Sequence, residues 1–116
     1  MSSLIIINEP PSSSKTWNAL RLCAALIGQD EEVQVFLMND GVFNVTINQS
    51  PPDEIAGQAT SKKLSELHSL GAQIFYCSQC VESRGININE IAPEIEKSNL
   101  PKLAKQIQEA SKVISF

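Results

Sequence analysis

The sequence has 116 residues, of which 42% are hydrophobic and 19% are charged, with 5 Gly and 6 Pro. We predict one folded, soluble domain over residues 1–116, because this composition excludes disordered, collagen-like and low-complexity proteins. The net charge of −4 and the single basic pair Lys62-Lys63 argue against direct nucleic-acid binding, and the apolar runs are too short for a membrane span, so we expect a cytoplasmic protein.

The first part of the chain predicts a strand, a helix and a second strand. The aliphatic run at residues 4–8 is typical of a strand buried on both faces of a parallel sheet, and the prolines and serines after it form a loop. Apolar residues recur at spacings of three and four over residues 15–27, which predicts a helix that Gly28 ends in a left-handed conformation. Residues 33–38 predict the second strand, and Asn39-Asp40-Gly41 is expected to end it and turn the chain.

The middle of the chain is less regular. Residues 42–59 are expected to be mostly loop, with either a short helix or an extended piece at 42–45 and a turn at Pro51-Pro52. A leucine stripe predicts a helix over residues 60–70, closed by Gly71. Residues 72–77 predict a third strand, followed by a short helix over residues 78–83 that ends before Gly85.

The last part of the chain predicts a short edge strand at residues 94–97, a helix that begins after Ser98 or Asn99, and a final strand at 112–116. Strands and helices alternate along the whole sequence. This order predicts an α/β fold, a three-layer α/β/α sandwich with a mostly parallel sheet of about five strands. Ligands and reactive groups gather beyond the carboxyl ends of strands in such sheets, which directs attention to the loops at residues 8–14, 39–42 and 77–85.

Reactive side chains cluster in the last of these loops, residues 77–85. Cys77 ends the third strand where a helix begins, so backbone N–H groups and the helix dipole would lower the pKa of its thiol, and Arg84 could add a positive charge. The alternative is that Cys77 is a small buried apolar residue. The sequence has neither a Gly-x-Gly-x-x-Gly nor a P-loop motif, which argues against the usual nucleotide sites.

Cys77 and Cys80 also form a Cys-x-x-Cys pair, which leaves two further alternatives open. A structural zinc site would need Cys23 and His68 as its other ligands, although Cys23 fits a helix core and His68 a surface or packing position. A dithiol redox pair needs no further ligand, but such a pair usually follows an early strand rather than the third.

Short motifs run through the whole sequence: Asn8-Glu9-Pro10, Ala19-Leu20-Arg21-Leu22, residues 35–42, Leu70-Gly71-Ala72, Arg84-Gly85-Ile86 and residues 112–116. In this order they resemble the DsrE/DsrF family of small sulfur-handling proteins, which includes the TusD subunit of the sulfur relay. The resemblance implies a three-layer α/β/α domain that assembles into homotrimers or homohexamers, in some cases with paralogous subunits.

The same resemblance assigns roles to the cysteines. In the sulfur-transferring members, a cysteine at the strand end before Arg-Gly carries a persulfide, and Cys77 occupies this position. Cys80 resembles a second cysteine of some uncharacterised members. The implied partners are sulfur-donor and sulfur-acceptor proteins, and thiol exchange of this kind needs no metal or organic cofactor.

Two functions stay open at this point. The first is a sulfur carrier or sulfurtransferase that holds sulfane sulfur on Cys77, with Cys80 and Arg84 as further site residues. The second is a non-catalytic oligomeric subunit that binds a small anionic ligand or a protein partner at the same crevice. Its support is the serine-rich loop at residues 12–14, which could bind an anion or could simply cap the helix after it.

Overall fold

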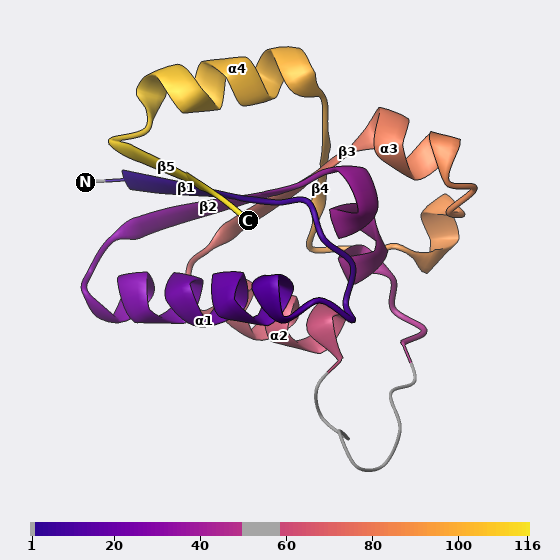
Figure 1. Ribbon diagram of the computed structural model, residues 1–116, viewed down its shortest axis with the longest axis horizontal. Helices are drawn as coiled ribbons and strands as arrows, with labels where there is room; N and C mark the ends of the chain where they lie inside the picture. Colours follow the sequence, from indigo (N-terminus) through magenta and orange to yellow (C-terminus); the bar gives the residue numbers. More distant parts are fainter. Residues whose placement is uncertain (1, 50–58) are drawn as a thin grey trace.

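Five parallel strands form one sheet in the part of the chain that the computed structural model describes, residues 2–49 and 59–116 (Figure 1). The strand order is β4-β3-β2-β1-β5, and all four neighbouring pairs are parallel. The strands are β1 (Ser2–Ile7), β2 (Glu32–Leu37), β3 (Gln73–Cys77), β4 (Glu96–Ser98) and β5 (Lys112–Ser115).

Helices cover both faces of this sheet. The α-helices are α1 (Ser14–Gly28), α2 (Thr60–Ser69), α3 (Ser78–Ser83) and α4 (Leu100–Glu109), and the 3-10 helices are η1 (Asn39–Val45) and η3 (Ile88–Glu90). Figure 1 shows α1 and α2 below the sheet and α4 above it. The predicted three-layer α/β/α sandwich with a parallel sheet is therefore confirmed.

The strands bury side chains on both faces, which explains their continuous apolar sequences. On β1, Ile5 and Ile7 belong to the larger core under α1 and α2, whereas Leu4 and Ile6 belong to a smaller core. The smaller core also contains Leu103 of α4. The two cores thus lie on opposite faces of the sheet.

The predicted elements are present, and most of their ends shift by one or two residues. Gly71 has a φ of 111°, as the prediction of a left-handed helix end requires. The same prediction for Gly28 is wrong, because the left-handed residue at this corner is Asp30, with a φ of 62°. Residues 42–45 belong to η1, and the predicted turn at Pro51-Pro52 lies outside the described residues.

Gly41 fixes the position of η1 at the carboxyl end of β1. A Cβ atom at this residue would overlap the carbonyl oxygen of Ile7, so only glycine allows the two backbones to approach so closely. The approach holds the beginning of η1 against the rim of the sheet, next to the end of β2.

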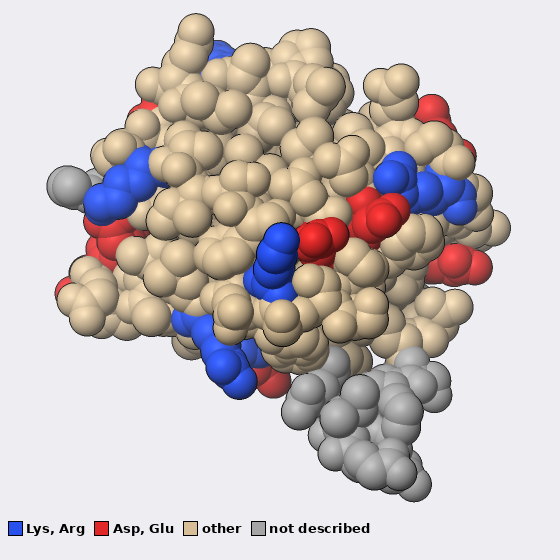
Figure 2. Space-filling view, viewed as in Figure 1, with Lys and Arg blue, Asp and Glu red and all other residues tan. Residues whose placement is uncertain are grey.

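Basic and acidic side chains are mixed on the surface. On the face shown in Figure 2, Lys and Arg side chains are scattered, and most of them lie beside Asp or Glu. Within the described ranges, no helix is both long enough and apolar enough to cross a bilayer.

Candidate functional site

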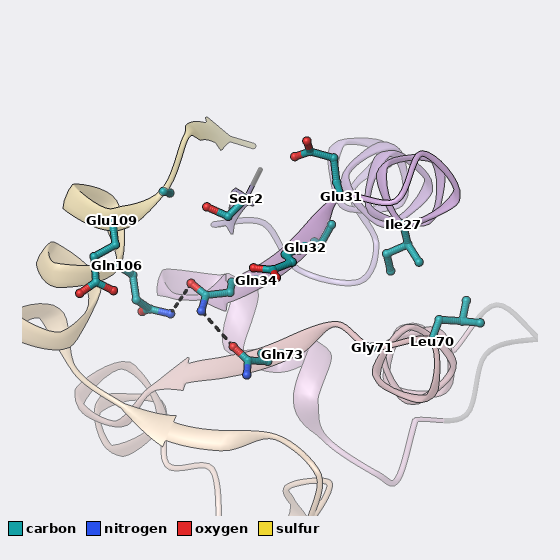
Figure 3. A pocket seen from close by; sticks show the side chains of 12 residues that line it. Ser2, Ile27, Glu31, Glu32, Gln34, Leu70, Gly71, Gln73, Gln106 and Glu109 are labelled. Atoms are coloured by element: carbon teal, nitrogen blue, oxygen red, sulfur yellow. Dashed lines mark hydrogen bonds between the residues drawn. The ribbon is translucent and has the colours of Figure 1, made fainter.

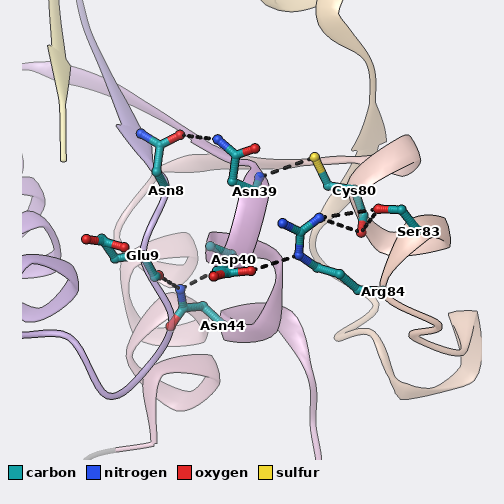
Figure 4. Close-up of polar contacts among 9 residues, drawn as sticks. Asn8, Glu9, Asn39, Asp40, Asn44, Cys80, Ser83 and Arg84 are labelled. Carbon is teal, nitrogen blue, oxygen red and sulfur yellow. Dashed lines mark hydrogen bonds and ion pairs between the residues drawn. The ribbon is translucent and has the colours of Figure 1, made fainter.

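The loops after β1, β2 and β3 meet at the carboxyl edge of the sheet and bring the cysteine pair together with several polar residues (Figure 4). Cys77 is the last residue of β3, and Cys80 lies in α3, which follows directly. Asn39 opens η1 after β2, and Arg84 is the residue after α3 that caps its carboxyl end. The edge predicted from the strand order is therefore where the predicted site residues lie.

Cys77 is a buried residue, with 3% of its surface exposed. It belongs to the smaller core, which its side chain shares with Leu4, Ile6, Phe36 and Leu103. Cys77 is buried because its side chain faces α4 at the end of β3. The next residue already belongs to α3. In this single chain the thiol is thus packed against apolar side chains rather than open to solvent.

The pKa of the Cys77 thiol is raised, chiefly because burial disfavours the thiolate. The backbone N–H groups of Cys80 and Gln79 act in the opposite direction, since they favour the negatively charged sulfur. The Cys80 thiol raises the pKa further through its own hydrogen bond and charge. The predicted backbone donors are present, but the predicted lowering of the Cys77 pKa is wrong in direction because burial outweighs them.

Cys80 is the more exposed thiol of the pair, with intermediate burial. Its Sγ accepts a hydrogen bond of 3.2 Å from the backbone N–H of Asn39. Asn39 has a φ of 52°, an uncommon left-handed conformation that Asn tolerates better than most residues. Its side chain donates to Oδ1 of Asn8 at 2.8 Å, which ties the ends of β1 and β2 to α3.

Arg84 lies at the same rim, and its guanidinium contacts oxygen atoms. Nε donates to Oδ1 of Asp40 at 2.9 Å, and Nη1 donates to the carbonyl of Cys80 at 3.4 Å and to Oγ of Ser83 at 3.3 Å. These contacts join the end of α3 to η1 (Figure 4). Arg84 therefore positions the helix that carries Cys80, and Asp40 balances its charge.

The other residues considered for the site lie elsewhere. Cys23 is fully buried in the larger core, where burial raises the pKa of its thiol to about 12. His68 is exposed on α2. Ser13 accepts a hydrogen bond from the backbone N–H of Lys15, so the helix-capping interpretation of the serine-rich loop is confirmed for this residue.

A pocket of about 600 Å³ lies at the opposite, amino end of the strands (Figure 3). Gln106 donates to Gln34 and Gln34 donates to Gln73, so three amides form a chain across it. Its lining also includes Glu31 and Glu32, but none of the cysteines. The chemistry of these side chains suits polar binding rather than nucleophilic attack.

Sequence reasoning missed three contributors to the site: Asn8, Asn39 as a donor to sulfur, and Asp40 as the partner of Arg84. Asn39 and Asp40 were interpreted only as residues that end a strand or turn the chain. The rule that strand ends meet at one edge pointed to their loop. The contacts themselves join residues 41 and 44 positions apart, which local pattern does not reveal.

Comparison with known proteins supports one family over the whole chain. The sequence model described as the DsrE/DsrF-like family matches residues 1–116. The uncharacterized protein MK0008 of Methanopyrus kandleri is 28% identical over 97% of this chain and 91% of its own length. A protein of Vibrio parahaemolyticus named TusC homolog is 26% identical over 74% of this chain and 73% of its own length.

A solved structure agrees with these sequence matches. The crystal structure of the ychN protein from E. coli covers 100% of both chains with a TM-score of 0.87 and 28% sequence identity. The likeness therefore extends over the sheet, its helices and the edge where the cysteines lie.

Proposed function

We propose that this chain, which belongs to the DsrE/DsrF-like family, accepts sulfane sulfur on Cys77 as a persulfide and passes it to an acceptor thiol. Its partners are a sulfur-donor protein and a sulfur-acceptor protein. The family and the relatives named TusC homolog support a role in sulfur handling, and the site geometry supports the choice of residue.

One observation carries this proposal: the Cys77 sulfur lies at the carboxyl edge of the sheet with two backbone N–H donors and a second thiol beside it. The donors can hold a sulfur anion after the thiol has lost its proton. Cys80 is half-buried, so it lies nearer to solvent than Cys77 does. A persulfide held there would be shielded from bulk water by the smaller core.

The transfer needs no external oxidant or reductant. The Cys77 thiolate attacks the outer sulfur of a donor persulfide R–S–SH, the donor S–S bond breaks, and R–S⁻ leaves with the electron pair and takes up a proton. Cys77 then carries S–SH. An acceptor thiolate attacks the outer sulfur in the same manner and restores the Cys77 thiol.

Cys80 offers a competing reaction at the same site. Its thiolate can attack the inner sulfur of the Cys77 persulfide, which forms a Cys77–Cys80 disulfide and releases HS⁻. The two thiols are close enough to influence each other's ionisation, so Cys80 lies near the sulfur that it would attack. Sulfur on Cys77 should therefore persist longer when Cys80 is replaced.

Intact-mass measurement after treatment with a small alkyl persulfide tests the proposal. We expect the wild type to gain one sulfur atom, Cys77→Ser to gain none, and Cys80→Ser to keep the added sulfur longer than the wild type. Cys23→Ala is the matched control, because Cys23 is buried on the other face of the sheet and should load like the wild type. If no donor adds sulfur to the wild type, a sulfur-carrier role is excluded.

The burial of Cys77 and its raised pKa favour a second candidate, a non-catalytic oligomeric subunit that binds an anionic ligand or a protein at the same rim. Alkylation separates the two candidates. If Cys77 in the wild type is alkylated at pH 6 to 7 no faster than a model thiol and also takes up no sulfur, the results support the binding role. The assembly into trimers or hexamers stays a prediction, which the mass of the native protein in solution tests.

A further inference from the structure

Ser98 ends β4 directly beside Cys77. The two residues are register partners on the neighbouring parallel strands β3 and β4. Register partners in adjacent parallel strands direct their side chains to the same face of the sheet. Leu103 of α4 packs with Cys77, and Ser98 lines a pocket together with residues of α4, so both side chains lie on the α4 face.

The hydroxyl of Ser98 has no partner among the described residues. Only 3% of the residue is exposed, and its Oγ is a buried atom without a hydrogen bond. A buried hydroxyl in this state has lost its water without compensation, and such groups in native proteins call for an explanation. The unused donor lies one strand away from the sulfur that the proposed function loads.

The pocket beside Ser98 has a volume of about 300 Å³ and lies between the edge strand and α4. Lys102 and Lys105 of α4 line it together with Ser98, and its other charged residues are Lys97, Glu96 and Glu109. In the described part of the chain, neither Lys102 nor Lys105 forms an ion pair. Three lysines and two glutamates thus line the pocket, so the surroundings of the Ser98 hydroxyl are only weakly positive.

We propose that Ser98 donates a hydrogen bond to the outer sulfur of a persulfide on Cys77 and so completes a binding site for the carried sulfur. This inference rests on the proposed function. The inner sulfur has the backbone donors of Gln79 and Cys80, while the outer sulfur, displaced by one S–S bond of about 2 Å, has none of these. Neighbouring strands are only about 4.8 Å apart, so that added bond brings the outer sulfur within reach of the Ser98 hydroxyl.

The lifetime of the loaded protein tests this site. Wild type and Ser98→Ala are treated with a small alkyl persulfide, freed of donor, and incubated with an acceptor thiol while intact mass is followed. We expect Ser98→Ala to lose its sulfur about tenfold faster, the effect of one hydrogen bond to a charged acceptor. Without sulfur, Ser98→Ala should unfold at the same denaturant concentration as the wild type or a higher one, because it removes an unpaired buried hydroxyl.

Two further variants separate this role from a structural one. Ser98→Thr keeps the hydroxyl and should restore the wild-type lifetime, and Ser61→Ala, at a buried serine on α2, should leave it unchanged. An unchanged lifetime in Ser98→Ala overturns the role of Ser98 and leaves the sulfur-carrier proposal in place. A wild type that takes up no sulfur overturns both.

Discussion

The two faces of the sheet have different cores. The face under α1 and α2 holds the larger core, in which Cys23 is completely buried. The face under α4 holds a small core around Phe36 and Leu103, and Leu103 is the only buried residue of α4. Cysteine therefore occurs in the larger, thick core on one face and at the rim of the smaller, thin core on the other.

The two environments give the two cysteines different chemical properties. The larger core excludes water from Cys23, and this burial outweighs the backbone hydrogen bond that favours the thiolate, so the thiol stays protonated to about pH 12. On the α4 face, Cys77 is also buried, but the backbone N–H groups of Cys80 and Gln79 oppose the effect of burial on its pKa. A thin core at a strand edge can thus keep a cysteine dry and still leave it within reach of groups that bind an anion.

The largest effect should come from truncating the thick core. Leu20→Ala, at a fully buried position on α1, should lower the free energy of unfolding by about 3–5 kcal/mol, because the surrounding core cannot close the cavity. Leu103→Ala on α4 should cost less, about 2 kcal/mol, since the exposed helix can settle onto the sheet. Urea denaturation of both variants measures the difference, and equal losses would contradict the unequal thickness of the two cores.

Alkaline pH should weaken the fold chiefly through Cys23. The unfolded thiol ionises near pH 8.5, whereas the folded one keeps its proton to about pH 12, so the folded state binds more protons between these values. The free energy of unfolding should therefore fall as pH rises above about 9, by up to about 1.4 kcal/mol per pH unit from this group. Denaturation of wild type and Cys23→Ala between pH 8 and 10.5 measures the slope that Cys23 contributes.

Cys77 serves as the comparison in that experiment. Its raised pKa has the same sign of effect, but the backbone donors of Gln79 and Cys80 oppose the effect of burial. Cys77→Ala should therefore reduce the alkaline slope less than Cys23→Ala does. A larger reduction in Cys77→Ala would show that burial raises the thiol pKa more strongly at the rim than in the larger core.

The sequence predicted the order and type of the elements because each depends on local chemistry. The aliphatic runs of β1 and β2, the leucine spacing of α2 and the turn at Gly71 are all properties of neighbouring residues. The position of Cys77 at a strand end followed from the same patterns. These patterns also placed the candidate site at the correct edge of the sheet, because the strands are parallel.

The burial and contacts of the site could not be predicted in this manner. Strands buried on both faces have no polar alternation, so the sequence does not reveal that Cys77 faces α4 and the small core. The hydrogen bond from Asn39 to Cys80 depends on how η1 packs after β2. The pKa of Cys77 then follows from the balance between burial and these contacts, which only the assembled fold determines.

The smallest effect is expected at the amino end of the thin face. Gln73 and Cys77 lie on the same strand and the same face, at opposite ends, and the Gln73 side chain accepts a hydrogen bond of 2.9 Å from Gln34 near the surface. Gln73→Ala should change the free energy of unfolding by no more than about 0.5 kcal/mol, because hydrogen bonds between exposed side-chain amides contribute little to stability. Urea denaturation measures this change, and intact mass after persulfide treatment should show the same sulfur uptake and lifetime as the wild type. A shortened lifetime would show that the two ends of this face are coupled, because the substituted residue lies four positions before Cys77 on the same strand.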